Sequence, residues 1–261
     1  MHSTATTDIG RGVGNVDRIN LVIKIMMIRL DKYLCDLNIG SRSEIKEYIR
    51  KKLITVDGVI ASDPGMRISE DSAVTYRGEP LIYKKFRYYM LNKPKGVVSA
   101  TQDNIDTTVI DLLKDINTKD MFPVGRLDKD TEGLLIITND GEMSHRLLSP
   151  KSHVEKCYLV HLKHNITSDD IKTLCMGVDI GDDTITLPAK VEAIATDRIY
   201  LTITEGRYHQ VKRMLEAVDN KVVFLKRVSF GPLELDPSLS PGEYRELDES
   251  EIIMLNLYKG I

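Results

Sequence analysis

The sequence predicts an α+β protein in two parts, a small N-terminal module and a larger domain that mixes strands with helices. The chain has 261 residues, of which 42% are hydrophobic and 29% charged, the ordinary balance of a globular protein with a sizeable core. Apolar residues at helical spacing open the first part, and strand and helix patterns alternate in the second. We expect a leader at 1–26, the N-terminal module at 27–76, a linker at 77–87 and the larger domain at 88–256.

Cysteine usage and hydropathy exclude several classes of protein. The three cysteines are widely spaced and form no C-x-x-C pair, which supports neither a disulfide framework nor a zinc ribbon. No stretch approaches the ~18 apolar residues that a membrane-spanning helix needs. Met26 and Met27 directly precede the first periodic segment, so we expect the natural start there, with residues 1–26 as an upstream extension or a disordered tail. A cytoplasmic protein fits this pattern.

The N-terminal module is predicted to contain two helices followed by a hairpin. Residues 29–38 carry apolar side chains at i, i+3, i+4 and i+7, which indicates one buried helix face. Ser41 and Glu44 then form a capping-box pattern that begins a second helix. Strand-like residues 54–56 and 59–61 flank an Asp-Gly turn, the typical signal of a hairpin.

The polar side of these two helices is basic. Charge alone fits a solvated helix face as well as a surface that contacts RNA phosphates. The candidate phosphate-binding residues are Arg29, Lys32, Arg42, Lys46, Arg50 and Lys51.

The larger domain alternates predicted strands and helices. We expect a short helix at 107–113, a buried strand at 134–138 and a helix through 145–148 that follows an Asn-Asp-Gly turn. Further strands are expected at 157–162 and 198–204. A helix with one apolar face is expected within the last segment, 205–218.

Three segments of this domain carry the candidate functional side chains. The loop G-R-L-D-K-D-T-E-G, residues 125–133, stands before a buried strand, where it can present Asp128 in a cleft or form a polar loop with local ion pairs. The junction E-G-R-Y-H-Q-V-K-R-M, residues 205–214, contains Lys212 off the apolar stripe and a histidine, His209, of either structural or catalytic use. Tyr158 begins a strand and points into a cleft or into the core. The six histidines lack the spacing of metal ligands.

Taken in order, these segments resemble the RNA pseudouridine synthases of the ribosomal type. The L-K-R-V-S-F-G-P-L stretch at 225–233 is similar to the C-terminal motif of that family, and the N-terminal module resembles its S-four-like RNA-binding domain. The resemblance covers residues 27–256 and implies the pseudouridine synthase fold, a mixed and mainly antiparallel sheet with flanking helices. Residues 144–156 resemble the branch that acts on small-subunit rRNA, the RsuA type.

The resemblance also implies a reaction and roles for five residues. Asp128 is the essential carboxylate, which attacks either the sugar or the uracil ring while uracil is detached, turned and rejoined through C5. Lys212 pairs with that aspartate, where many relatives carry arginine, and Tyr158 stacks on the flipped uracil. Arg126 holds the opened nucleotide or the RNA backbone, and Leu225 lines the apolar side of the base pocket. No cofactor or metal is required.

The expected substrate is ribosomal RNA or an assembly intermediate of the small subunit, with position 516 of 16S rRNA as the expected uridine. The enzyme is expected to be a cytoplasmic monomer. Three alternatives stay open: a synthase acting on 23S rRNA, a non-catalytic rRNA-binding protein, and a retaining glycosidase that pairs Asp128 with Asp130 or Glu132. The last needs carboxylates on opposite sides of a sugar, which a single loop does not suggest.

Overall fold

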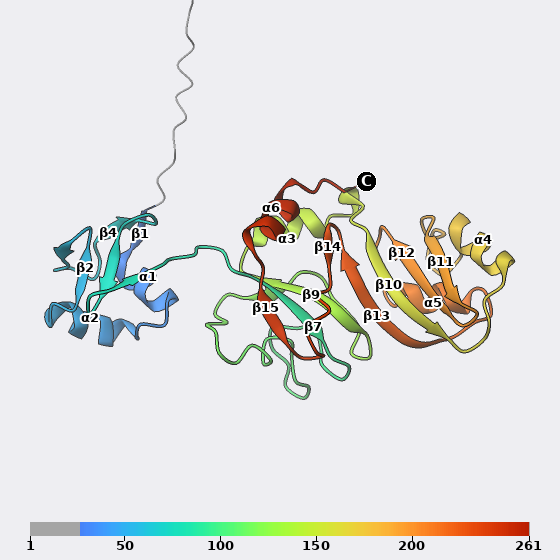
Figure 1. Cartoon of the computed structure of the whole chain (residues 1–261), viewed down its shortest axis with the longest axis horizontal. Coiled ribbons are helices and arrows are strands. Elements are labelled where there is room, and N and C mark those ends of the chain that lie inside the picture. Colours follow the sequence, from blue (N-terminus) through green and yellow to red (C-terminus); the bar gives the residue numbers. More distant parts are fainter. Residues whose placement is uncertain (1–26, 261) are drawn as a thin grey trace, which may run out of the picture. The chain divides into compact units, whose positions relative to one another are not determined.

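The computed structural model describes residues 27–260, so the leader expected at 1–26 lies outside the described residues. The chain forms two compact units, which are described separately (Figure 1). One comprises residues 27–35 and 39–83, and the other residues 36–38 and 84–260. Within the described part of the chain, no helix combines the length and the hydropathy needed to cross a lipid bilayer.

The N-terminal unit consists of two helices and short antiparallel strands. Its elements are β1 (Met27–Arg29), α1 (Leu30–Asp36), α2 (Arg42–Arg50), β2 (Ile54–Val56), β3 (Val59–Ile60), β4 (Arg67–Ser69), β5 (Val74–Tyr76) and β6 (Glu79–Leu81). β1 pairs with β4, and the other four strands form a sheet in the order β3-β2-β5-β6. Leu34, Ile45 and Ile54 have no exposed surface, so both helices and the sheet contribute to one small core.

The predicted capping box and hairpin are present in this unit. The Ser41 hydroxyl accepts a hydrogen bond from the backbone N–H of Glu44, whose carboxylate accepts one from the N–H of Ser41. The predicted linker at 77–87 is wrong in its first half, because residues 79–81 form β6 and pair with β5. The open edge of β5 offers unpaired N–H and C=O groups, with which residues 79–81 pair. The N-terminal module therefore extends past residue 76, where its hydrophobic pattern suggested that it ends.

The larger unit is organised around one mixed sheet. Its strands are β7 (Tyr88–Lys93), β8 (Phe122–Pro123), β9 (Glu132–Thr138), β10 (Lys156–Leu162), β11 (Lys190–Ala195), β12 (Arg198–Ile203), β13 (Val222–Phe230), β14 (Leu233–Glu234) and β15 (Tyr244–Glu246). The main order is β11-β12-β10-β13-β9-β7-β15, with β8 beside β9 and β14 beside β13. The β9–β13 pair is parallel and the other named pairs are antiparallel, which confirms the mainly antiparallel sheet.

Helices cover both faces of this sheet. The helices are α3 (Gly141–Leu148), α4 (Ser168–Met176), α5 (Gln210–Glu216) and α6 (Glu249–Leu257), with a 3₁₀ turn at Pro150–Ser152. Alternate residues of β7 and β9 enter two different hydrophobic clusters, as the two-residue period of a strand requires. One cluster includes side chains of α4 and α5, and the other includes side chains of α3 and α6.

Gly133 joins the two halves of the sheet. In the parallel pair, Gly133 of β9 lies opposite Arg227 of β13 with a φ of +103°. A Cβ atom at this position would lie 2.2 Å from the carbonyl oxygen of Arg227, so only glycine allows the two backbones to approach. This contact places the segment before β9, which carries Asp128, beside β13.

The short helix predicted at 107–113 is wrong. The segment forms turns, in which the N–H and hydroxyl of Thr108 both donate to the carboxylate of Asp111. Thr108 also forms an isolated bridge with Val98, and this pairing uses backbone groups that a helix would need. Val109 and Leu113 are nonetheless buried, so the apolar residues of this segment pack in the core without forming a helix.

Candidate active site

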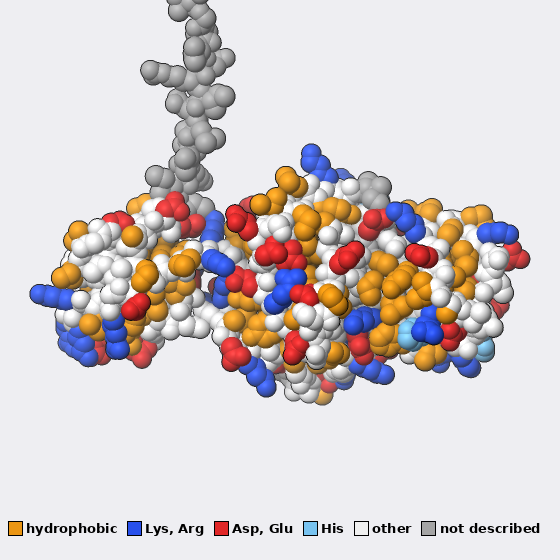
Figure 2. All heavy atoms as spheres, viewed as in Figure 1, with side chains coloured by type: hydrophobic (Ala, Val, Ile, Leu, Met, Phe, Trp, Pro, Cys, Tyr) orange, Lys and Arg blue, Asp and Glu red, His pale blue; other side chains and the backbone are white. Residues whose placement is uncertain are grey.

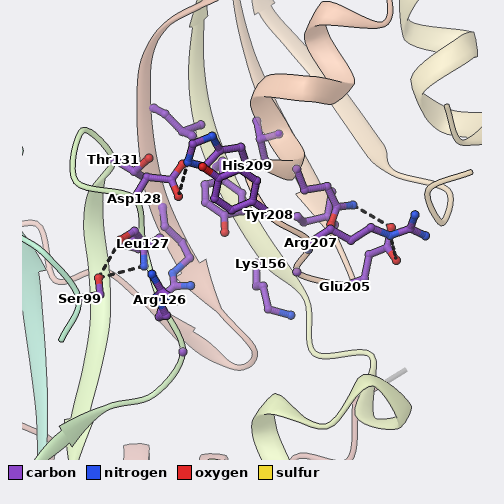
Figure 3. Close-up of a pocket in the computed structure, with 18 of the residues that line it drawn as sticks. Ser99, Arg126, Leu127, Asp128, Thr131, Lys156, Glu205, Arg207, Tyr208 and His209 are labelled. Atoms are coloured by element: carbon purple, nitrogen blue, oxygen red, sulfur yellow. Dashed lines mark hydrogen bonds and ion pairs between the residues drawn. The ribbon is translucent and has the colours of Figure 1, made fainter. Parts of the chain in front are cut away.

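A pocket of about 820 Å³ opens in the larger unit (Figure 3). Its walls come from the loop at 125–131, the loop at 204–209, the start of α5 and the strands β10 and β13. The five candidate residues of the larger domain all line it: Arg126, Asp128, Tyr158, Lys212 and Leu225. They belong to four segments of the chain, so folding brings together side chains that the sequence separates widely.

Asp128 forms an ion pair with Lys212. The Lys212 ammonium lies 2.9 Å from Oδ2 of Asp128 and 2.6 Å from Oδ1 of Asp130. Burial alone would lower the pKa of Lys212, but the hydrogen bonds to Asp130 and Asp128 outweigh it, and the pKa lies above its ordinary value. The same bond to Lys212 lowers the pKa of Asp130. Since one ammonium binds both aspartates, it offsets part of their negative charge and orients the Asp128 carboxylate.

His209 is a second neighbour of Asp128. Its Nε2 lies 3.5 Å from Oδ1 of Asp128, on the carboxylate oxygen that Lys212 does not bind. The residue takes a left-handed conformation, with a φ of +50°, directly before α5. A histidine at this place is neither a buried core residue nor a metal ligand but a wall of the pocket (Figure 3).

Two polar side chains, those of Lys93 and Ser99, hold the backbone of the Asp128 loop through hydrogen bonds. The fully buried ammonium of Lys93 donates to the carbonyl oxygens of Pro94, Asp128 and Thr131 at 2.9–3.0 Å. Burial lowers the pKa of Lys93 to about 8, against the attraction of the nearby aspartates. The Ser99 hydroxyl donates to the carbonyl of Leu127 and accepts from its N–H. These contacts hold the backbone on both sides of Asp128, and Figure 3 shows those of Ser99 with Leu127.

The floor of the pocket is formed by side chains from β10 and β13. Tyr158 and Leu225 are 7% and 6% exposed, so both predicted readings of Tyr158 hold at once: it packs in the core and lines the pocket. Arg227 lies opposite Tyr158 in the strand register and is fully buried. Its Nε donates to the carbonyl of Leu134, while its Nη2 has no hydrogen-bond partner among the described residues. Burial lowers the pKa of Arg227, and attraction to the Tyr158 hydroxyl opposes that shift.

Lys156 and Arg126 add positive charge to the pocket. Burial lowers the pKa of Lys156 to about 8, and repulsion by Arg227 adds to the effect. The Lys156 ammonium donates to the carbonyl of Val154 and lies 5.8 Å from the centre of the Phe230 ring. Arg126 is exposed beside the pocket, so it is accessible to a large ligand such as RNA.

Sequence reasoning missed several residues that build this site. No role is assigned from the sequence to Lys93, Ser99, Lys156 or Arg227, although all but Lys93 line the pocket. Lys93 ends a strand of six buried residues. A charged side chain is rarely buried without a partner, so a lysine at the end of such a strand indicates a buried polar contact. Among the described residues, no cluster of three or more His, Cys, Asp or Glu side chains is arranged to hold a metal ion.

The basic residues of the N-terminal module are exposed, as expected for either interpretation of that face. Arg42, Lys46 and Arg50 recur every four residues on α2 and therefore share one side of the helix, where Figure 2 shows basic side chains gathered. Arg29 is paired with Asp31 at 2.8 Å, and Lys51 with Glu47 at 2.8 Å. The six candidates thus differ in how much of their charge is already neutralised.

Comparisons with known proteins agree with this fold. The family model described as RNA pseudouridylate synthase matches residues 87–217, and that of the S4 domain matches residues 28–74. The chain therefore belongs to the RNA pseudouridine synthases, a family of isomerases. Within that family it is of the RsuA type, with an S4 domain ahead of the catalytic domain.

Similar proteins match nearly the whole length of the described chain. A protein named uncharacterized RNA pseudouridine synthase YtzG, from Bacillus subtilis, is 52% identical over 88% of this chain and 98% of its own length. The ribosomal small subunit pseudouridine synthase A of Vibrio cholerae is 42% identical over 86% of this chain and 98% of its own. A crystal structure of a pseudouridylate synthase matches 87% of this chain and 99% of its own, with 38% identity and a TM-score of 0.63.

Proposed function

We propose that this enzyme converts one uridine of small-subunit ribosomal RNA to pseudouridine and that Asp128 is its essential carboxylate. The observation that carries the proposal is the ion pair at the pocket: the Lys212 ammonium lies 2.9 Å from the Asp128 carboxylate, and the buried Tyr158 and Leu225 line the same pocket with apolar surface suited to a flat base. The similarity to ribosomal small subunit pseudouridine synthase A supports small-subunit rRNA as the substrate, and position 516 of 16S rRNA is the target that we propose.

The reaction needs little beyond what the pocket supplies. The N1–C1′ bond of uridine breaks, a C5–C1′ bond forms, C5 loses its proton and N1 ends with one, so the composition of the RNA does not change. The target base has to leave its stack to reach Asp128, at a cost of a few kcal/mol. In this proposal the flipped uracil stacks on the ring of Tyr158, and the Tyr158 hydroxyl relays the C5 proton by passing its own proton to solvent, from which N1 receives one.

The N-terminal S4 domain belongs to the proposal as the part that holds RNA. Arg42, Lys46 and Arg50 form one basic side of α2, and each phosphate contact contributes to affinity in a salt-dependent manner. Replacing all three with glutamine should weaken RNA binding and flatten its salt dependence, with the same change at Lys172 on α4 as control. An unchanged salt dependence in the triple variant would show that this helix does not contact the RNA.

Mapping pseudouridines across all ribosomal RNA tests the proposed substrate. RNA from cells with and without the gene is compared, and the deleted strain is complemented with wild type or with Asp128→Asn. We expect one 16S site to lose its pseudouridine and to regain it only with the wild type. A lost site in 23S rRNA would support the alternative substrate, and no change in any ribosomal RNA would contradict the proposal. A monomeric protein in the cytoplasm, where ribosomal RNA is located, completes the proposal.

A further inference from the structure

The side chain of Tyr208 lies at the pocket with most of its surface facing solvent. It is 76% exposed, whereas each of the other ten tyrosines, all within the described residues, is buried or half-buried. Its ring stacks on His209, with 3.9 Å between the ring centres and 18° between the planes. His209 in turn reaches Asp128, at 3.5 Å. An aromatic stack therefore extends from the candidate carboxylate outward (Figure 3).

The loop that carries this stack is tightly held. The backbone N–H of Arg207 donates to the side chain of Gln210, which donates to Glu205. The Arg207 guanidinium binds Glu205 and the carbonyl of Thr184, and the Arg213 guanidinium donates to the carbonyl of Tyr208 itself. The loop is thus ordered by polar contacts made on either side of Tyr208, while the ring itself contributes little buried area.

An ordered loop that displays an unburied ring has a geometry suited to stacking. His209 covers one face of the Tyr208 ring, and the large exposed fraction leaves the other face accessible to a second flat group. Folding gains little from a ring in this position, because burial is what makes aromatic side chains stabilising. The neighbouring Arg126 is exposed and basic, so the same opening favours a polyanion.

We propose that the stack of Tyr208 and His209 binds an unpaired RNA base adjacent to the target uridine. This inference rests on the proposed function, in which the target uracil enters the pocket at Asp128. When that uracil leaves its stack, the neighbouring base loses one stacking partner. The outer face of Tyr208 replaces that partner, and the contact lowers the cost of opening the RNA.

A cycle of protein and RNA changes tests this contact. Full-length Asp128→Asn protein, with and without Tyr208→Ala, is titrated with a small-subunit rRNA fragment around the mapped uridine. The fragment carries either the natural bases or an abasic nucleotide at one neighbour of the target. We expect Tyr208→Ala to weaken binding of the fragment with natural bases by ~5- to 150-fold, the range of base–aromatic stacking. It should have little effect on the fragment in which an abasic nucleotide replaces the stacked neighbour of the target. Tyr208→Phe should retain the affinity, because it retains the ring.

Turnover measured in parallel separates this inference from the proposed function. In the active enzyme, Tyr208→Ala should raise KM more than it lowers kcat, and Met176→Ala, an equally exposed apolar residue of α4, should behave as the wild type. If the wild type modifies the fragment but Tyr208→Ala weakens natural and abasic RNA alike, the stacking contact is refuted. If the cycle shows coupling but the wild type does not modify the fragment, the proposed substrate fails and the contact stands.

Discussion

Replacing Lys93 with methionine tests whether a buried ammonium holds the loop that carries Asp128. Lys93 has no exposed surface, and two of its three carbonyl acceptors, those of Asp128 and Thr131, belong to that loop. Methionine has a similar length and removes the ammonium from these carbonyls; that of Thr131 loses its donor, while that of Asp128 keeps the backbone N–H of Thr131. The change therefore removes the anchor while it preserves most of the packing.

Two opposing effects set the expected change in stability. Burial lowers the pKa of Lys93 from 10.5 to about 8, which corresponds to ~3 kcal/mol against the charged form in the folded state. Methionine avoids this cost, but it leaves the carbonyl oxygens of Pro94 and Thr131 without their donor, at ~1–3 kcal/mol each. The free energy of unfolding at pH 7 should therefore change by less than ~3 kcal/mol, as measured by urea denaturation.

The effect on activity should be much larger than the effect on stability. A displacement of ~1 Å at a reacting group can cost ~100-fold in rate, so we expect at least that loss in single-turnover assays with saturating RNA. Lys95→Met is the matched control, because Lys95 is exposed two residues further along the chain, and it should match the wild type in both measurements. A Lys93→Met enzyme within about threefold of the wild-type rate would refute the anchoring role.

The pH dependence of stability provides an independent check on Lys93. Between its folded pKa of about 8 and its ordinary value of 10.5, the unfolded chain binds more protons at this residue than the folded protein does. Stability of the wild type relative to Lys93→Met should therefore increase with rising pH, by up to ~3 kcal/mol across this window. A difference that does not vary with pH would mean that the buried amine titrates normally.

Four further outcomes are expected. Tyr158→Phe should retain RNA affinity but lose most turnover, and Tyr158→Leu should lose both; two fully active variants would leave Tyr158 with a packing role only. Lys212→Met should reduce single-turnover rates more than tenfold and Lys212→Arg less, because arginine restores a cation between the aspartates. RNA affinity should fall as the pH rises from 7 to 9, since the Lys156 ammonium loses its proton around a pKa of about 8, and Lys156→Arg should remove this fall in binding titrations. Gly133→Ala should lower the free energy of unfolding by ~3 kcal/mol or more in urea, because its Cβ would collide with the Arg227 backbone.

Much of the local structure follows from the sequence alone. The capping box at Ser41, the N-cap at Asp140 and the alternating strand at 198–203 depend on residues close together in the chain. Where a local sequence pattern predicted the wrong structure, pairing with a segment outside that pattern determined the structure. Residues 107–113 form no helix because Thr108 pairs with Val98, and residues 79–81 join a sheet although their Glu-Pro-Leu sequence does not predict a strand.

The sequence by itself determined the fold class and the order of the motifs, because each motif is a short run whose spacing is set by the chain, and the resemblance of these runs to the pseudouridine synthases implied the five candidate residues that line the pocket. Only the tertiary structure decided how these runs meet. Lys212 reaches Asp128 across 84 positions, and this contact depends on the parallel pairing of β9 with β13 that Gly133 allows. Burial decides which roles are open to Lys93 and Arg227, which are buried, and to Tyr208, which is exposed. It results from packing between distant segments and is not a property of any single stretch of sequence.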